Sequence, residues 1–194
     1  NTGSLNNIVG DFYGNYTYSF AGTAQGGAIY NSGTIDTISG SFTYNYASAH
    51  PNGGAYGGAI YTTASLRLLA DAKDYEFSNN YVTTSGGSSV TSQGIYVGNK
   101  NAILTIQADN AGSWTFNDSI DGVKGYTAIL KSETGDGYIN LFNQISNANL
   151  VLDNSTLITA NDDATTYSLE SLVIQGEANS YWDLDFQYRK ATES

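Results

Sequence analysis

Short apolar segments separated by Gly, Ser, Asn and Asp recur along the chain. Residues 35–38, 66–69 and 103–106 are examples, and aliphatic side chains dominate each of them. Short β-branched or aliphatic runs with turn residues on both sides are typical of β-strands. No stretch keeps a helical apolar period beyond two turns. The pattern therefore predicts an all-β protein.

Two motifs repeat along the chain in phase with each other. Gly-Gly-Ala-Ile-Tyr at residues 26–30 returns at 57–61, and weaker copies begin at Gly94 and Thr127. A second motif, an aromatic residue followed three positions later by Asn, alternates with the first, at steps of 30, 35 and 37 residues (42 − 12, 77 − 42 and 114 − 77). Repeats of this length without helices fit the coils of a β-solenoid, a stack of parallel strands.

Stacking of coils would place equivalent residues above one another at the strand spacing of ~4.8 Å. An interior aliphatic ladder is expected from Ile29, Ile60, Ile95 and Ile129. An interior aromatic ladder is expected from Phe12, Phe42, Phe77 and Trp114. A third ladder, in which side-chain amides hydrogen bond along the axis, is expected from Asn15, Asn45, Asn80 and Asn117.

After about residue 130 the pattern changes to cleaner alternating strands, at residues 138–142, 149–152, 171–174 and 181–186. We interpret them as shorter coils of the same solenoid. The prediction is one domain of about five to six coils over residues 1–186. Residues 1–130 would form the motif-bearing coils and 131–186 the shorter ones. Residues 187–194 would be a tail or linker.

Composition and charge exclude several classes of protein. The 194 residues include 7 Lys and Arg against 18 Asp and Glu, a net charge of −11, with no Cys and one His, His50. This balance argues against binding of nucleic acid or anionic membranes through a basic surface. A disulfide framework, a thiol nucleophile and a multi-His zinc site are excluded. No apolar run is long enough for a transmembrane helix, and the start at Asn1 suggests a mature or excised piece.

The two interleaved motifs resemble the repeats of the polymorphic outer-membrane protein family of autotransporters. The resemblance covers residues 1–130, with two full copies of the first motif and three of the second, while the copies at Gly94 and Thr127 depart from the pattern. The later strands resemble the C-terminal coils of autotransporter passengers. The resemblance implies a right-handed parallel β-helix that is exported and displayed on the bacterial surface by a C-terminal barrel.

A column of tyrosines is the strongest candidate for a binding site. Alternation places Ile inside and Tyr outside in each copy of the first motif, so Tyr30, Tyr61 and Tyr96 are expected to line up on the outer face of one sheet. Such a column would stack against sugars or anchor a protein partner. The alternative is that it only covers the sheet through cross-coil aromatic pairs. A second set, Tyr16, Tyr46 and Tyr81, is expected to be a structural ladder.

Carboxylates are weaker candidates for catalysis or metal binding. Asp183 and Asp185 would share one face of a strand, and Asp162–Asp163 and Asp71 with Asp74 are further pairs. Two carboxyls can serve a glycosidase, but cations for substrate are scarce here, so these residues are interpreted as solvated faces and no catalytic residue is expected. The turns at 109–110 and 161–163 match no calcium motif. Neither a metal nor a cofactor is expected, and His50 is expected to be exposed without a role.

Three functions are therefore open. The first is adhesion, in which the solenoid binds a glycan or protein on host or neighbouring bacterial cells. The second is a rigid stalk that binds nothing, and the third is a polysaccharide-active enzyme. The adhesion and stalk hypotheses place the chain outside the cell, without nucleic acid and without insertion of these residues into a membrane. The open ends of such a stack also favour end-to-end self-association.

Overall fold

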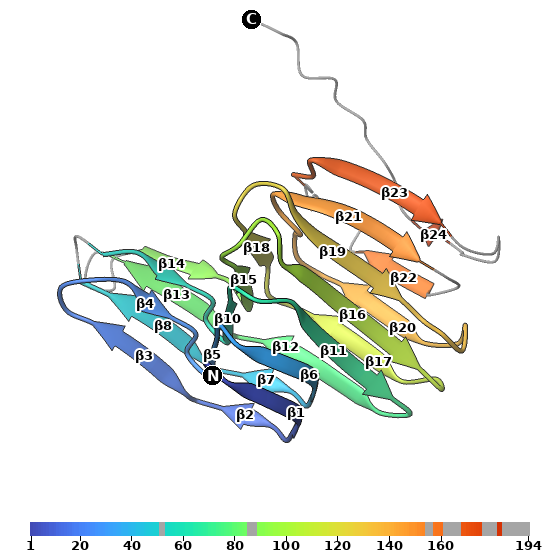
Figure 1. Ribbon diagram of the computed structural model, residues 1–194, viewed down its shortest axis with the longest axis horizontal. Coiled ribbons are helices and arrows are strands. Elements are labelled where there is room, and N and C mark those ends of the chain that lie inside the picture. Colours follow the sequence, from blue (N-terminus) through green and yellow to red (C-terminus); the bar gives the residue numbers. More distant parts are fainter. Residues whose placement is uncertain (51–52, 85–88, 154–156, 161–167, 176–181, 184–194) are drawn as a thin grey trace, which may run out of the picture.

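The computed structural model describes residues 1–50, 53–84, 89–153, 157–160, 168–175 and 182–183. Within these ranges every regular element is a β-strand and none is a helix (Figure 1). The strands form five sheets, and all pairings are parallel except that of β13 with β14. This arrangement confirms the all-β prediction and is consistent with a β-solenoid. The predicted tail, residues 187–194, lies outside the described residues.

Two long sheets of seven strands run the length of the molecule (Figure 1). Sheet A contains β1 (Ser4–Val9), β6 (Thr34–Ser39), β11 (Leu66–Asp71), β16 (Ile103–Asp109), β19 (Tyr126–Lys131), β21 (Ala148–Asp153) and β23 (Ser171–Gln175). Sheet B contains β2 (Phe12–Tyr13), β7 (Phe42–Thr43), β12 (Asp74–Ser78), β17 (Ser113–Phe116), β20 (Tyr138–Leu141), β22 (Leu157–Ala160) and β24 (Trp182–Asp183).

Three shorter sheets complete the fold. Sheet C contains β3 (Tyr16–Ser19), β8 (Tyr46–Ala49), β13 (Tyr81–Thr84) and β14 (Ser89–Ser92). Sheet D contains β4 (Ala24–Gln25) and β9 (Ala55–Tyr56). Sheet E contains β5 (Ile29–Asn31), β10 (Ile60–Thr62), β15 (Ile95–Val97) and β18 (Ile120–Gly122). Sheets C and D form the extension at the left of Figure 1.

Alternation along the strands builds the core. In β11, Leu66, Leu68 and Ala70 point inward and are buried, whereas Arg67 and Leu69 on the other face are half-buried. Inward residues of sheets A, B and E form one continuous apolar cluster. The extension has a separate, smaller cluster made mostly of alanines, Ala24, Ala47, Ala49, Ala55 and Val82. Because these side chains are short, the extension has far less apolar volume to bury than the main body.

The aliphatic ladder starts as expected and then departs from the expectation. Ile29, Ile60 and Ile95 pair in register in sheet E and are buried. The next member is Ile120, which pairs with Ile95. The prediction that Ile129 continues this ladder is wrong. Ile129 lies in β19 of sheet A, paired with Thr105 and Val151, and is only half-buried. The step from Ile95 to Ile120 is 25 residues (120 − 95), so the motif copy at Thr127 falls beyond sheet E.

The aromatic ladder contains Phe116 in place of the expected Trp114. Phe12, Phe42 and Phe77 stack with ring centroids 4.6 and 4.7 Å apart, and Phe116 continues the stack at 5.1 Å. Trp114 is also fully buried, but it pairs with Tyr75 and Ile139, two positions earlier on the same inward face. Trp114 and Phe116 both lie on the inward face of the strand, so the spacing of the motif does not identify which of them continues the ladder.

The amide ladder is polar and directional. Asn15 Nδ2 donates to Asn45 Oδ1 at 2.9 Å, Asn45 Nδ2 donates to Asn80 Oδ1 at 2.9 Å, and Asn80 Nδ2 donates to Asp118 Oδ2 at 2.6 Å. The backbone N–H of each asparagine donates to the same acceptor. Each asparagine side chain thus donates a hydrogen bond to the next repeat toward the C-terminal end. The last acceptor is the carboxylate of Asp118.

The prediction that Asn117 is the fourth residue of the amide ladder is wrong. Asn117 is exposed, and Asp118 occupies the buried position. In the first three repeats a residue with left-handed backbone precedes the ladder asparagine, namely Gly14, Tyr44 and Asn79, with φ of 65°, 58° and 57°. No residue with positive φ lies between Phe116 and Asp118. The fourth turn is one residue shorter, so the side chain that reaches the ladder comes from the second position after the aromatic residue.

We predict that Asn80→Ala lowers the free energy of unfolding by about 3 kcal/mol, because it leaves buried donors and acceptors of Asn45, Phe42 and Asp118 unpaired. Asn117→Ala is the matched control, and the change there should be within about 0.5 kcal/mol. Denaturant unfolding of both variants measures the difference. Equal losses in the two variants would contradict the ladder as assigned.

We also predict a pH-dependent effect at the end of the ladder. Burial raises the pKa of Asp118, although hydrogen bonds from Asn80, Ser92 and Asn79 oppose this. A pKa above the unfolded value means that the stability this group contributes is present at low pH and is lost as pH rises through the folded pKa. Asp118→Asn should therefore have a higher Tm than the wild type at pH 7. The difference in Tm between the variant and the wild type should become smaller as pH falls toward about 4. A Tm difference that is the same at every pH would contradict the raised pKa of Asp118.

Candidate functional site

The candidate site is built on the outer face of sheet E. Tyr30, Tyr61 and Tyr96 pair in register there, each one position after a buried isoleucine of the same strand. Their rings are nearly parallel: the centroids of Tyr30 and Tyr61 are 5.6 Å apart at an interplanar angle of 8°, and those of Tyr61 and Tyr96 are 5.8 Å apart at 4°. The strand register therefore creates the tyrosine column that the alternation predicts.

The stacking decides what the column can offer to a ligand. The faces of Tyr61 are turned toward its two neighbours, so a sugar ring cannot lie on them. Tyr61 is only 8% exposed, whereas Tyr30 at the end of the stack is 39% exposed and Tyr96 is half-buried. The expectation of an exposed column is thus wrong for Tyr61. The most accessible ring of the column is that of Tyr30.

A fourth tyrosine, which the sequence analysis missed, covers the column. Tyr56 comes from β9 of sheet D, and its ring lies 4.7 Å from that of Tyr96 and 6.5 Å from that of Tyr61, tilted by about 50° to both. The motif repeats point to residues of sheet E only, and Tyr56 belongs to no repeat copy in that sheet. We call Tyr30, Tyr56, Tyr61, Tyr96 and Asp121 the aromatic corner.

Asp121 gives the aromatic corner a polar end. It pairs with Tyr96 in the register of β15 and β18. Its Oδ1 accepts hydrogen bonds from the Gly122 N–H at 2.8 Å and from Asn147 Nδ2 at 2.9 Å. Among the described residues, its Oδ2 accepts a hydrogen bond only from Gln93 Nε2, at 3.5 Å. This second oxygen is therefore weakly bonded and can accept a stronger hydrogen bond from a ligand.

The hydroxyls of Tyr61 and Tyr96 remain protonated at neutral pH, because the pKa of each is raised. Burial raises the pKa of Tyr61, with further contributions from Tyr30 and Tyr56, while a hydrogen bond with Gln25 opposes the rise. Burial also raises the pKa of Tyr96, and the charge of Asp121 raises it further. Both groups can therefore act as neutral hydrogen-bond donors and acceptors, and neither can act as a phenolate base.

The second tyrosine set forms a stack on the outer face of sheet C. Tyr16, Tyr46 and Tyr81 are in register, with centroid separations of 5.2 Å in both pairs. Tyr16, at its end, is exposed. His50 is not the free exposed residue that was expected: it is half-buried, and its ring lies 4.5 Å from that of Phe20.

Of the carboxylate pairs, Asp71 with Asp74 lies within the described residues. Asp71 Oδ1 accepts a hydrogen bond from Asn110 Nδ2 at 2.6 Å, and Asp74 Oδ1 accepts one from Ser113 Oγ at 2.7 Å, so each carboxylate links neighbouring repeats. Asp162, Asp163 and Asp185 lie outside the described residues, and Asp183 falls in β24. No group of three or more His, Asp or Glu side chains suited to a metal ion occurs in the part of the chain that the structure describes.

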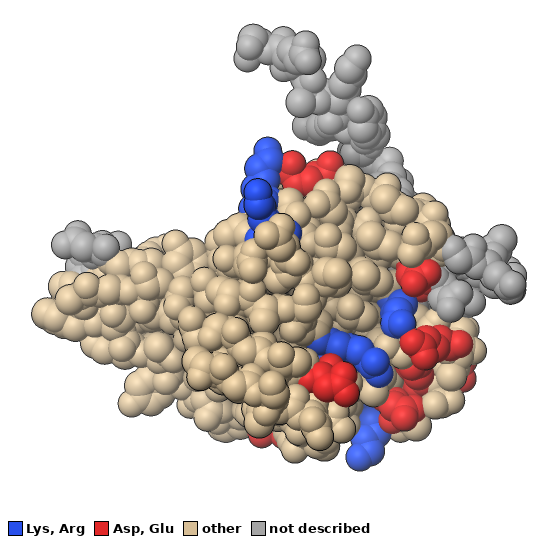
Figure 2. Space-filling view, in the orientation of Figure 1, with Lys and Arg blue, Asp and Glu red and all other residues tan. Residues whose placement is uncertain are grey.

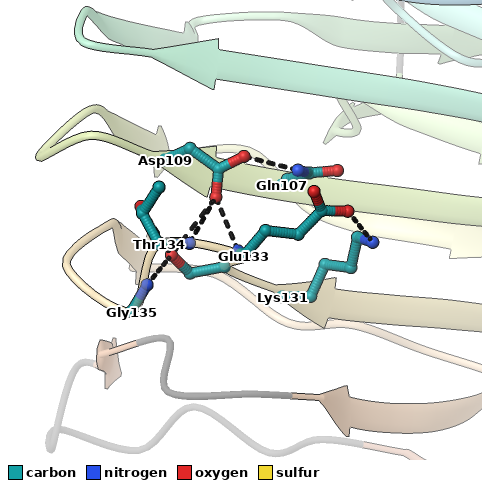
Figure 3. Close-up of polar contacts among 7 residues, drawn as sticks. Gln107, Asp109, Lys131, Glu133, Thr134 and Gly135 are labelled. Atoms are coloured by element: carbon teal, nitrogen blue, oxygen red, sulfur yellow. Dashed lines mark hydrogen bonds and ion pairs between the residues drawn. The ribbon is translucent and has the colours of Figure 1, made fainter.

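Asp109, expected in a solvated turn, is instead buried and structural (Figure 3). One of its carboxylate oxygens accepts from Gln107 Nε2 at 2.5 Å, and the other accepts from the backbone N–H of Glu133 at 2.6 Å and that of Thr134 at 3.4 Å. The carboxylate therefore fastens the turn between β19 and β20 to the preceding repeat.

Charge is distributed unevenly over the molecule. Residues 1–66 contain two acidic residues, Asp11 and Asp36, and no Lys or Arg. In the face shown in Figure 2, charged side chains gather over the main body and are missing from the extension at the left. Three of the four tyrosines of the aromatic corner come from this charge-poor part of the chain.

Comparison with protein-family models, with curated proteins and with solved structures finds no match. In the ranges that the structure describes, no helix is long and apolar enough to cross a membrane.

The close fit of Tyr61 gives a test of the corner. A Cβ added to Gly98 would lie 2.3 Å from Tyr61 Oη, so Gly98→Ala should destabilise the protein by about 1–3 kcal/mol through overpacking. In a Tyr61→Ala background the same change should cost much less, which a double-mutant cycle measures by denaturant unfolding. Gly22→Ala, where the added Cβ would lie 3.4 Å from Ser19 Oγ, is the control. Additive losses would show that Gly98 and Tyr61 do not interact.

Proposed function

We propose that this chain is a segment of a surface-displayed, autotransporter-like passenger that adheres to host or neighbouring bacterial cells. The repeat motifs and the parallel stacking of strands support this proposal. We further propose that the stack is a right-handed β-helix of about five to six coils, because crossover connections between parallel strands are almost always right-handed. The export and surface display of the chain belong to the same proposal.

The single observation that carries the adhesive function is the aromatic corner. Tyr30 offers the most exposed ring of the column, Tyr96 and Tyr56 offer ring edges, and Asp121 offers a weakly bonded carboxylate oxygen. Sugar rings are bound by such combinations, because one face of the sugar is apolar while its hydroxyls need hydrogen-bond partners. A surface glycan, or a protein presenting a similar mixed surface, is the partner we propose.

The charge of the region favours a neutral ligand. Residues 1–66 supply no Lys or Arg to pair with a uronate or sialate carboxylate. Asp121 would repel an anionic sugar placed against Tyr96. We therefore propose neutral hexose-rich glycans rather than acidic polysaccharides as ligands of the aromatic corner.

A rigid stalk is the second candidate, and the axial ladders favour it. The rings of Phe42, Phe77, Tyr46 and Tyr61 stack on their neighbours in the next repeat, so their faces are used inside the molecule. Such ladders stiffen a stack whether or not it binds anything. The two roles are separated by whether the isolated chain binds a surface at all.

A polysaccharide-active enzyme remains the third and least favoured candidate. Asp71 and Asp74 each accept a hydrogen bond from a neighbouring repeat, which favours a structural role for both carboxylates. We do not expect cleavage of glycans by this chain.

Binding to an array of neutral and acidic glycans, followed by titration of the best ligand, tests the adhesive function. We expect the wild type to bind neutral glycans, and we expect Tyr30→Ala and Asp121→Asn each to weaken binding at least about tenfold, the scale of a lost stacking or charge-assisted contact. Tyr138→Ala, which removes a tyrosine of similar exposure from sheet B, is the control and should bind like the wild type. Circular dichroism verifies the fold of each variant.

Three results would contradict the proposal. Absence of binding to any glycan or cell surface would favour the stalk. A preference for acidic glycans would contradict a neutral ligand. Equal losses in Tyr138→Ala and Tyr30→Ala would place the binding site outside the aromatic corner.

A further inference from the structure

The tyrosine stack of sheet C has no part in the proposed function. Within it, Tyr46 and Tyr81 are paired in register between β8 and β13, with ring centroids 5.2 Å apart and an interplanar angle of 4°. Tyr16 stacks on the other side of Tyr46, and Ser92 of β14 pairs with Tyr81 on its other side. Both rings of the pair are half-buried, so they are packed in register and still open to small molecules in solvent.

Composition makes tyrosine the side chain that oxidants meet first. Among side chains, Cys and Met are the usual targets of oxidation, and the 194 residues contain neither. They contain 16 Tyr and two Trp, of which Trp114 is fully buried. A one-electron oxidant in solvent therefore acts mainly on tyrosine.

Oxidation of two neighbouring tyrosines can join them covalently. Loss of one electron and one proton from each phenol gives two phenoxyl radicals, in which the unpaired electron is shared between the oxygen and the ring carbons ortho to the hydroxyl. One ortho carbon of each ring forms a carbon–carbon bond with the other, and the hydrogen on each of these carbons then moves to the phenol oxygen. The product, dityrosine, has two hydrogen atoms fewer than the two tyrosines, and the hydrogen peroxide that accepts them becomes two molecules of water.

We propose that Tyr46 and Tyr81 are a site of dityrosine formation, which links the second and third repeats when a peroxidase and hydrogen peroxide supply the oxidation. Strand register holds the two rings side by side, so coupling within this pair is faster than coupling between molecules. The pair of Tyr61 and Tyr96 in sheet E is less suited, because its ring centroids are 5.8 Å apart and Tyr61 is only 8% exposed. This proposal does not depend on glycan binding.

The link stabilises the extension, which has the smaller of the two cores. The apolar cluster of the extension is made mostly of alanines, and no disulfide reinforces it because the chain has no Cys. A bond between Tyr46 and Tyr81 closes a loop of 35 residues (81 − 46) and restricts the unfolded chain in the way that a disulfide does. Oxidation therefore makes β8 and β13 harder to separate.

Oxidation of the folded 194-residue chain at low protein concentration, with a haem peroxidase and hydrogen peroxide, tests the proposal. Trypsin cleaves the denatured product after Arg67 and Lys73, so Tyr46 and Tyr81 fall in separate peptides, 1–67 and 74–100. We expect a protein that stays monomeric, shows dityrosine fluorescence and yields these two peptides joined, with a mass two hydrogen atoms below their sum. Fragmentation of the joined peptides should place the bond between Tyr46 and Tyr81.

Single substitutions that keep the aromatic ring identify the pair. Tyr81→Phe removes the phenol but leaves a ring in the stack, and it should lower the yield of joined peptides at least about fivefold. Two controls should keep the yield within about twofold of the wild type. They are Tyr96→Phe, which removes the sheet E pair, and Tyr138→Phe, which removes a tyrosine of sheet B that is 42% exposed. Circular dichroism verifies the fold of each variant.

Four results would overturn the proposal. Two are the absence of dityrosine and its formation only between molecules. A yield that falls in Tyr96→Phe but not in Tyr81→Phe would place the link in sheet E. An equal yield from the chain unfolded in urea would show that the stacking of the rings does not direct the coupling.

Discussion

The structure depends on register between parallel strands that are neighbours in space but about 30 residues apart in the chain. Once Ile60 lies beside Ile29, the other ladder residues of the repeat also meet their counterparts: phenylalanine meets phenylalanine, tyrosine meets tyrosine, and asparagine meets asparagine. A slip of one residue would turn each apolar side chain outward and break the amide ladder at the same time. The ladders therefore act together, and each one fixes the register for the others.

Much of this arrangement was predictable from the sequence, because the first three repeats keep their spacing. The errors at Ile129, Trp114 and Asn117 all fall in the fourth repeat, where the spacing changes: the step from Ile95 to Ile120 is 25 residues (120 − 95), whereas the step from Phe77 to Phe116 is 39 residues (116 − 77). There, Phe116 and Asp118 take the ladder positions: Trp114 shares the inward alternation of Phe116, and Asn117 keeps the motif spacing although the turn is one residue shorter. The cover of Tyr61 by Tyr56 was not predictable for a different reason: it depends on how sheet D lies against sheet E, a contact that no periodic pattern encodes.

Polar side chains in this molecule have two distinct tasks. Asn45, Asn80 and Asp109 are buried and hold neighbouring repeats together by bonds to backbone and side-chain groups. Asp121 is only partly engaged and faces the tyrosines. The acidic residues thus include structural carboxylates such as Asp109 and a carboxylate with a weakly bonded oxygen, Asp121, and their hydrogen bonds distinguish the two. The tyrosines divide in the same way, since a ring stacked on both faces stabilises the fold and a ring at the end of a stack can meet a ligand.

The direction of the amide ladder makes the two ends of the array chemically unequal. Each ladder asparagine donates to the ladder residue of the next repeat. At one end, the side-chain oxygen of Asn15 accepts no hydrogen bond from a described residue. At the other end, the carboxylate of Asp118 has no hydrogen to donate. Another asparagine repeat could join before Asn15 without altering any existing bond. Inserting one after Asp118 would require that carboxylate to become an amide. Extending the amide ladder, in evolution or by engineering, therefore needs no substitution before Asn15, but it needs a substitution of Asp118 if the new repeat follows that residue.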